Sequence, residues 1–304
     1  MTPWALRSTG SLAGSAGLVG SVRPPATGAL AMLKQRVLTA VPLALVVLAI
    51  VWWAPGIWTQ GVMAAAMVMA AWEWADLAGL RAGAARLGYA GSVAGLIAVA
   101  ALLDVPARAG WQVPGLIWWL GIAVWLLSVS RRSAIPPLPG WLRGAAGLIT
   151  LTLAWLSVSA IHARSGLGPL WLTLLMGLVW GADIGGYFAG RRFGRRRLAA
   201  TISPGKTWEG VVGGLLLALL VALGVERISA GAAGDMPGLA WLLPVTVMVV
   251  VFSVVGDLAE SLLKRQAGRK DSGRLLPGHG GLLDRIDALL AAAPVMAAAL
   301  VSVS

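Results

Sequence analysis

Apolar residues recur along this chain in long blocks separated by short polar segments. The blocks cover residues 37–53, 57–74, 87–103, 114–129, 141–162, 167–188, 211–225, 239–256 and 282–303. An apolar run of roughly 18 residues or more is typical of a helix that crosses the hydrocarbon core of a membrane. The pattern therefore predicts an all-α fold, a polytopic transmembrane helical bundle of about nine spans.

The composition of the chain agrees with a membrane environment. Of its 304 residues, 58% are hydrophobic and 12% are charged, whereas an ordinary soluble domain is about half apolar and about a quarter charged. The bilayer must therefore solvate much of the surface. The absence of cysteine excludes disulfides, thiolate zinc sites and cysteine nucleophiles. With only His162 and His279, a histidine-rich metal site is excluded as well.

The basic residues are distributed unevenly between the polar segments. The formal net charge is +12, but no nucleic-acid partner is expected, because these residues lie between hydrophobic blocks, where they set topology and meet acidic headgroups. With the N-terminus in the cytoplasm, only Arg108, Arg164 and Arg227 of the basic residues after residue 33 fall outside. This asymmetry predicts an inner-membrane protein whose N-terminus and polar loops, residues 189–210 and 257–287, are cytoplasmic, and whose C-terminus is outside.

The pattern divides the chain into three regions. Residues 1–31 are rich in Gly, Ala, Ser and Pro and lack a continuous apolar run. They are therefore interpreted as a disordered extension rather than a signal peptide. Residues 32–165 are expected to form N-terminal transmembrane helices. Residues 166–304 are expected to form the C-terminal catalytic transmembrane region, because the polar motifs lie there.

The first polar motif continues the eighth apolar block. Asp257, Glu260, Ser261 and Lys264 are spaced i, i+3, i+4 and i+7, so they share one face of a helix. A carboxylate so close to the membrane is costly and usually has a functional partner, which makes Asp257 a candidate site residue. For Lys264 and Arg265 alone, an interfacial helix end with snorkelling side chains explains the pattern equally well.

The second polar motif covers residues 270–287 and contains four glycines and a proline within nine residues. Such a loop lets backbone N–H groups approach phosphate oxygens closely. Asp284 and Asp287 follow at i and i+3 on the first turn of the last helix, where acids are also ordinary partners of the helix dipole. Carboxylates are the ligands that Mg²⁺ prefers, usually one or two together with substrate phosphates.

The third polar motif joins Asp183 to the segment 203–210. Gly-Lys-Thr at 205–207 is not a P-loop, because Ala200 stands where the first glycine would fall and no soluble β-α context exists. What remains is a Gly-Lys pair just ahead of a helix N-terminus, which can cradle an anion. The arginine run 191–197 is interpreted as a topology and lipid-attraction signal. Asp183 lies within about one turn of the helix end and is a further candidate.

Together these residues resemble a known family. From Ser261 to Asp287, the pattern S-x-L-K-R-x4-K-D-x-G-x2-L-P-x-H-G-G-L-x-D-R-I-D resembles the signature of the phosphatidate cytidylyltransferases, also called CDP-diacylglycerol synthases. The segments 70–74, 182–194 and 202–210 are also similar to that family, and the resemblance covers about residue 32 to the end. Ile184 departs from it, since a small polar residue is expected there.

The resemblance implies that CTP and phosphatidate of the inner leaflet react to give CDP-diacylglycerol, for phospholipid synthesis, and pyrophosphate. It also implies Mg²⁺, with a second metal ion left open, and a homodimer. Because the lipid phosphate is already anionic, catalysis reduces to positioning and charge neutralisation. The residues expected to be catalytic are Asp257, Lys264, Asp284, Arg285 and His279.

The remaining expected site residues bind metal or phosphate. Asp257 and Asp284 are expected to converge on one divalent ion, with Asp287 and Asp183 as further candidate metal ligands. The residues expected to bind substrate phosphates are Ser203, Lys206, Ser261, Arg265, Lys270, Asp271, Gly280 and Gly281.

Other classes of membrane protein fit the sequence less well. A polytopic transporter of an anionic substrate is the main alternative. It would carry polar residues in the middle of several spans, often with an internal repeat, whereas here the polar motifs gather on one side. A CDP-alcohol phosphotransferase would show a compact aspartate cluster, which this chain lacks, and a scaffolding protein has no use for the signature loop.

Overall fold

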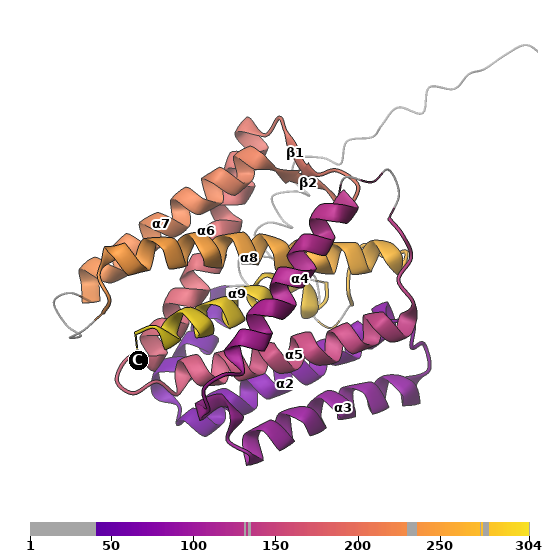
Figure 1. The fold of residues 1–304 in the computed structure, drawn as a ribbon, viewed down its shortest axis with the longest axis horizontal. Coiled ribbons are helices and arrows are strands. Elements are labelled where there is room, and N and C mark those ends of the chain that lie inside the picture. Colours follow the sequence, from indigo (N-terminus) through magenta and orange to yellow (C-terminus); the bar gives the residue numbers. More distant parts are fainter. Residues whose placement is uncertain are drawn as a thin grey trace, which may run out of the picture.

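The computed structural model describes residues 41–130, 132, 135–229, 236–273, 275 and 280–303. The extension predicted over residues 1–31 therefore lies outside the described residues. The fold is a bundle of helices with a small β-hairpin at one end (Figure 1). In chain order, its elements are a helix over Val41–Trp53, α2 (Gly56–Leu77), α3 (Gly83–Leu102), the 3-10 turn η1 (Val105–Ala107), α4 (Gln112–Ser130), α5 (Gly140–His162), α6 (Gly168–Phe193), β1 (Arg197–Ala199), β2 (Ser203–Thr207), α7 (Trp208–Ser229), α8 (Leu239–Gln266) and α9 (Leu283–Val301).

The predicted helical membrane fold is confirmed in outline. Within the described part of the chain, a helix occupies each of the apolar blocks. Six of these helices, α3 to α8, are long and apolar enough to cross a membrane. For α2, α9 and Val41–Trp53 the crossing remains a prediction, and so does the count of nine spans.

The prediction of an all-α fold needs one correction, in the segment 189–210. Instead of a loop, this segment contains the end of α6 and an antiparallel hairpin in which Arg197 pairs with Thr207 and Ala199 with Ser203. Side-chain hydrogen bonds hold the two ends of the hairpin together. The Glu209 carboxylate accepts hydrogen bonds from the backbone N–H groups of Arg195 and Arg196, at 3.1–3.2 Å. The Thr207 hydroxyl accepts one from Gly210 N at 3.1 Å, as a helix cap does. These contacts are made by polar side chains with the backbone, so hydrophobic patterning did not reveal them.

Helix α9 lies at the centre of the bundle and packs against α4, α5, α6 and α8. Its middle, from Ala291 to Ala293, is completely buried. Small side chains there let the neighbouring helices approach closely. Helices α8 and α9 approach closely at Gly256, because a Cβ atom at this position would collide with the carbonyl oxygen of Asp287. This close approach fixes how the polar end of α8 lies beside the first turn of α9.

Helices α6 and α7 form a closely packed pair through their glycines. A Cβ atom at Gly185 would lie 2.5 Å from the Gly213 carbonyl oxygen, and one at Gly214 would lie 2.5 Å from that of Ala182. A Cβ atom at Gly213 would overlap the side chain of Ala189. Such small-residue interfaces are common between membrane helices, where packing replaces the hydrophobic effect.

Contacts between the connections show that the polar motifs share one end of the bundle. Arg265 Nε of α8 donates a hydrogen bond to the Ile202 carbonyl oxygen of the hairpin at 3.4 Å. At the opposite end, Trp241 Nε1 donates to Ser302 Oγ at 2.9 Å, and Arg164 donates to the Val303 carbonyl oxygen at 3.3 Å. The hairpin and the C-terminal part of α8 therefore lie together, away from the C-terminal end of α9.

The α6–α7 interface yields a stability prediction. Gly213→Ala should destabilise the protein by about 1–3 kcal/mol, the usual cost of overpacking a close interface. Gly224→Ala, on the same helix but in open space, is the matched control and should be neutral or slightly stabilising, since alanine favours helix over glycine. Thermal unfolding of both variants in detergent measures the difference, and equal unfolding temperatures would contradict the packing argument.

Candidate active site

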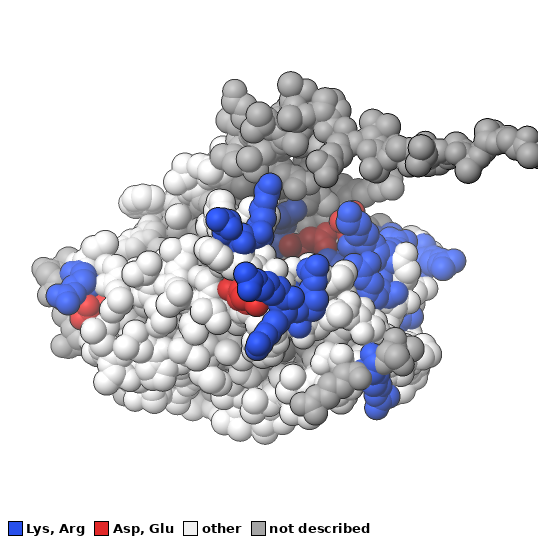
Figure 2. All heavy atoms as spheres, turned by 90° about the horizontal axis from the view of Figure 1, so that it is seen from above, with Lys and Arg blue, Asp and Glu red and all other residues white. Residues whose placement is uncertain are grey.

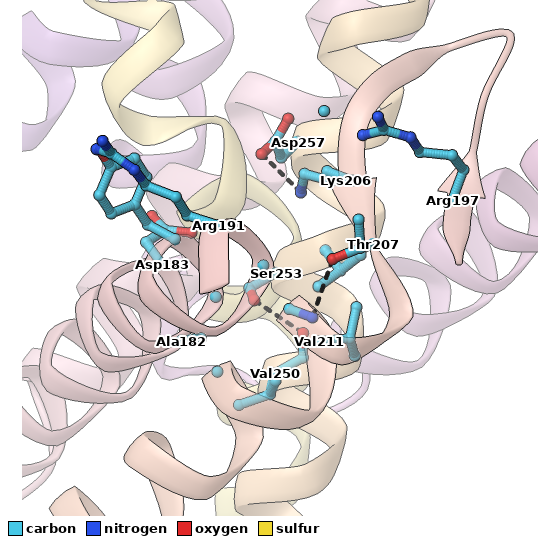
Figure 3. A pocket seen from close by; sticks show the side chains of 17 residues that line it. Ala182, Asp183, Arg191, Arg197, Lys206, Thr207, Val211, Val250, Ser253 and Asp257 are labelled. Carbon is cyan, nitrogen blue, oxygen red and sulfur yellow. Dashed lines mark hydrogen bonds and ion pairs between the residues drawn. The ribbon is translucent and has the colours of Figure 1, made fainter. Parts of the chain in front are cut away.

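A cavity of about 530 Å³ opens between α6, the hairpin, α7 and α8. Its size suits a substrate-sized ligand. Arg191, Arg197 and Lys206 supply positive charge on one side of it, whereas the opposite side is apolar at residues such as Val211 and Val250 (Figure 3). The cavity is therefore amphipathic. Its other lining residues are Ala182, Asp183, Gly186, Tyr187, Gly190, Gly205, Thr207, Gly210, Gly214, Ser253, Val254 and Asp257.

An ion pair joins the hairpin to α8 at the charged side of this cavity. Lys206 Nζ lies 2.6 Å from Asp257 Oδ2 (Figure 3). The other carboxylate oxygen accepts a hydrogen bond from Ser261 Oγ at 3.2 Å. The Ser261 contact is an i, i+4 pair, which confirms that these residues share a helix face. Both partners of the ion pair are 23–29% exposed, so an anionic ligand in the cavity can reach the ammonium group.

Asp183 projects into the same cavity from α6 (Figure 3). Asp183 is exposed as a residue, and its carboxylate makes no hydrogen bond or ion pair within the described residues. Lys206, Asp257 and Asp287 lie near enough to interact with one another and with Asp183 electrostatically. Several carboxylates and one ammonium group therefore converge at this place.

A second polar cluster lies where α8 meets α9. Lys264 Nζ bonds to Glu260 Oε2 and to Asp284 Oδ1, each at 2.6 Å. Glu260 is 2% exposed and Lys264 15%, so this cluster is less accessible than the Lys206–Asp257 pair. Breaking it would leave carboxylates in a poorly solvated place, which is costly.

Asp284 also holds the glycine-rich loop in position. Its Oδ2 atom accepts hydrogen bonds from Ser272 N and Gly281 N, each at 3.0 Å. Gly280 has φ +83, which a glycine adopts without strain, and this turn brings Gly281 N to the carboxylate. Protein donors therefore engage both oxygens of Asp284.

Glu73 is a site residue to which the sequence analysis gave no role. Although it lies on α2, its carboxylate reaches the same loop, where Oε2 accepts from Ser272 Oγ at 3.0 Å and from Leu283 N at 2.8 Å. Oε1 accepts from Leu282 N at 3.1 Å. The available signal was its position as an acidic residue within an apolar block, where an ionisable group implies a partner.

A second cavity, of about 640 Å³, lies on the α2 side of the loop. Lys270 and Asp271, both predicted phosphate-binding residues, line it together with Arg86, Arg269 and Asp76. Asp76 forms ion pairs with Arg269 and, at 4.0 Å, with Arg86. The predicted residues Lys270 and Asp271 are thus separated from the group around Lys206, which lines the first cavity.

The other predicted residues fall at several places around these clusters. Ser203 lies at the start of β2, three positions before Lys206, Arg265 binds the hairpin, and Arg285 is exposed on the first turn of α9. His279 lies outside the described residues. Asp257 and Asp284, which were expected to share one ion, each bind a different lysine. Within the described residues, no group of three acidic or histidine side chains is arranged to hold a metal ion as it stands.

The charged groups are not spread evenly over the surface. Figure 2 shows Lys and Arg gathered around acidic side chains that lie lower in the surface, next to a large uncharged area. Such an arrangement concentrates positive potential at one place and attracts anionic ligands.

Comparisons with known proteins point to one family. A profile of the cytidylyltransferase family matches residues 34–303. A protein of Pseudomonas aeruginosa named phosphatidate cytidylyltransferase is 41% identical over 274 residues, which cover 88% of this chain and 97% of that protein. Proteins of the same name from Haemophilus influenzae and Brucella suis are 34% and 36% identical, over 86% and 87% of this chain and 96% and 92% of theirs.

The Glu260–Lys264–Asp284 cluster yields a second stability prediction. Lys264→Met should destabilise the protein by about 3–5 kcal/mol, because it leaves two poorly solvated carboxylates unpaired. Adding Glu260→Gln should recover part of this loss. Arg227→Met is the matched control: its ion pair is 3.7 Å long and its side chain 82% exposed, so its loss should cost about 0–1 kcal/mol. Thermal unfolding in detergent tests all three, and equal effects of Lys264→Met and Arg227→Met would contradict the assignment.

Proposed function

The chain belongs to the cytidylyltransferase family, and we infer that it is a phosphatidate cytidylyltransferase, which makes CDP-diacylglycerol and pyrophosphate from CTP and phosphatidate. The observation that carries this conclusion is the family match over residues 34–303, together with the name shared by relatives of 34–41% identity. Within the described residues, the polar clusters gather at one end of the bundle. Neither the described structure nor the relatives therefore favour a transporter of an anionic substrate, which would need polar groups midway along several helices.

The chemistry of this reaction needs fixed positive charge more than a base. An oxygen of the lipid phosphate attacks the α-phosphorus of CTP, the bond from that phosphorus to the oxygen bridging to the β-phosphate breaks, and pyrophosphate leaves with the electron pair. The attacking oxygen is already anionic. The barrier therefore includes the repulsion between two anionic substrates, which preorganised cations reduce.

We propose that the lipid phosphate binds in the first cavity. Its cations Lys206, Arg191 and Arg197 suit a phosphate group. The apolar side, at Val211 and Val250, suits the glycerol and acyl part of the lipid. For CTP, we propose that the α-phosphate lies next to the lipid phosphate, as direct attack requires, and that the triphosphate extends from there toward the glycine-rich loop. Lys270, Asp271, Gly280 and Gly281 stay predicted contacts of its phosphates.

We place the proposed Mg²⁺ ion at the acidic side of the first cavity, and not between Asp257 and Asp284, the two residues first expected to share it. Asp183 and Asp257 would hold the ion, with Asp287 near them. The carboxylate of Asp183 lines the cavity and makes no hydrogen bond or ion pair within the described residues. Asp284 is less suited, because two of its three donors are backbone N–H groups of the glycine-rich loop. Asp257 is bound only by the side chains of Lys206 and Ser261, which can turn away when an ion binds. When bound, the ion would neutralise charge on substrate phosphates. A second metal ion remains open.

We also propose the placement in the membrane. The arginines near the hairpin and the loop, together with the Lys/Arg asymmetry of the connections, support a cytoplasmic location of the motif end in the inner membrane. The C-terminus would then lie outside, since α9 ends at the opposite end of the bundle from the loop. The homodimer stays a prediction from the family resemblance.

The decisive experiment measures pyrophosphate release by the purified protein in detergent micelles. Release should require CTP, phosphatidate and Mg²⁺ together. Asp257→Asn and Asp183→Asn should each lower the rate about a thousandfold, because each removes a carboxylate from the proposed metal site. Asp104→Asn, an exposed carboxylate away from both cavities, is the control and should retain the wild-type rate.

The possible outcomes separate the two parts of this proposal. Wild-type protein without CTP-dependent release would contradict the assigned reaction. Near-wild-type rates of both cavity variants at low Mg²⁺ would contradict the metal assignment only, and Asp287 and Asp284 would be tested next.

Membrane orientation can be tested by cysteine labelling, because the chain has no native cysteine. In intact cells, an impermeant thiol reagent should label Ser165→Cys, which is exposed between α5 and α6 at the end far from the motifs. It should not label Arg81→Cys, exposed between α2 and α3 at the motif end. The reverse pattern would refute the proposed orientation.

A further inference from the structure

Glu73 joins two parts of the chain that are distant in sequence. It is on α2, yet its hydrogen-bond partners are Ser272, Leu282 and Leu283, 199–210 positions later. Those residues flank the glycine-rich loop on both sides. A single carboxylate of the N-terminal half therefore holds together the two ends of the loop that carries the family signature.

The environment of Glu73 suits a fixed anion rather than a ligand-binding group. The residue is 1% exposed, so a small-molecule ligand has little access to it. No Lys or Arg within the described residues forms an ion pair with it. Its charge is instead stabilised by three donors and by the N-terminus of α9, where backbone N–H groups and the helix dipole favour an anion.

The loop backbone is packed directly against this carboxylate. A Cβ atom at Gly281 would lie 2.5 Å from Glu73 Oε2, and one at Gly273 would collide with Oε1. Both positions thus require glycine while Glu73 keeps its place. Gly273 and Gly281 therefore lie in direct contact with the Glu73 side chain.

The same loop residues are bound by the second polar cluster. Ser272 and Gly281 donate their backbone N–H groups to Asp284, and Asp284 binds Lys264. A displacement of the loop at Glu73 must therefore also displace Asp284 or break its hydrogen bonds. A continuous series of hydrogen bonds therefore connects Glu73 on α2 with Asp284 and Lys264 at the α8–α9 junction.

We propose that Glu73 is a positioning residue for the cytidylyl transfer: its carboxylate fixes Ser272 and residues 281–283, and so holds the backbone of Gly280 and Gly281 where it is proposed to contact the CTP phosphates. This inference rests on the proposed function. Glu73 does not touch substrate. It acts through the loop, and an error of about 1 Å in the position of catalytic groups can cost about a hundredfold in rate.

The test combines kinetics with hydrogen exchange. Glu73→Gln keeps the size of the side chain but replaces one carboxylate oxygen with an NH₂ group. That group is itself a donor, so it cannot accept the hydrogen bonds that the oxygen accepts. It should lower kcat about a hundredfold with a much smaller change in KM, and it should speed amide exchange in the peptide that contains Gly281, Leu282 and Leu283. Ser272→Ala, which removes one donor of three, should show the same changes to a smaller degree. Asp104→Asn, the same carboxylate-to-amide change at an exposed position, should show neither.

Each outcome decides a separate point. Unchanged exchange in the 281–283 peptide, or a fall in kcat no larger than that of Asp104→Asn, would overturn the role of Glu73. So would faster exchange spread evenly over all helices, which would indicate a general loss of stability. If Glu73→Gln does not fold, Ser272→Ala is judged by the same criteria. Wild-type protein that lacks transfer activity would overturn the proposed function instead, and the exchange measurement would still decide whether Glu73 anchors the loop.

Discussion

A charge at the edge of a hydrophobic bundle must have a partner, and the polar end of this structure is organised around that requirement. Asp257 is paired with Lys206, and Glu260 and Asp284 share Lys264. Glu73, the most buried of these carboxylates, is satisfied by N–H and O–H donors alone. Since an uncompensated buried ion costs several kcal/mol, each pairing constrains the elements that supply it. The hairpin, the loop and the ends of α2, α8 and α9 are thereby fixed relative to one another.

These pairings require backbones to approach closely, and glycines make the approach possible. Gly256 lets α8 cross the first turn of α9 so closely that a side chain there would meet the Asp287 carbonyl oxygen. Gly281 does the same for the loop against Glu73. In a helix of a soluble protein such glycines are usually destabilising, because glycine loses more conformational entropy on folding than other residues. In a membrane bundle, close packing is a principal source of stability. The polar contacts and the small residues are therefore parts of one arrangement.

How much the sequence predicts depends on whether a property is local. The helices follow from runs of apolar residues, and the shared face of Asp257 and Ser261 follows from helix periodicity, so both were predictable. The partners were not, because Glu73 and Ser272 are 199 positions apart. The expectation that Asp257 and Asp284 share an ion came from the cost of an unpaired carboxylate. That cost identifies which residues need a partner, but it does not distinguish a metal ion from a lysine, and the structure provides lysines.

The two lysines differ in a way that bears on catalysis. Lys206 has a single carboxylate partner and lines an open cavity, so an incoming phosphate can share its ammonium group while Asp257 keeps Ser261 as a donor. Lys264 is bound by two carboxylates, one of them 2% exposed. If a phosphate drew Lys264 away, both would lose their cation in a poorly solvated place. In the proposed mechanism, contact with phosphate therefore falls to Lys206 and its neighbouring arginines, whereas Lys264 maintains the junction between α8 and α9 from which the loop is held.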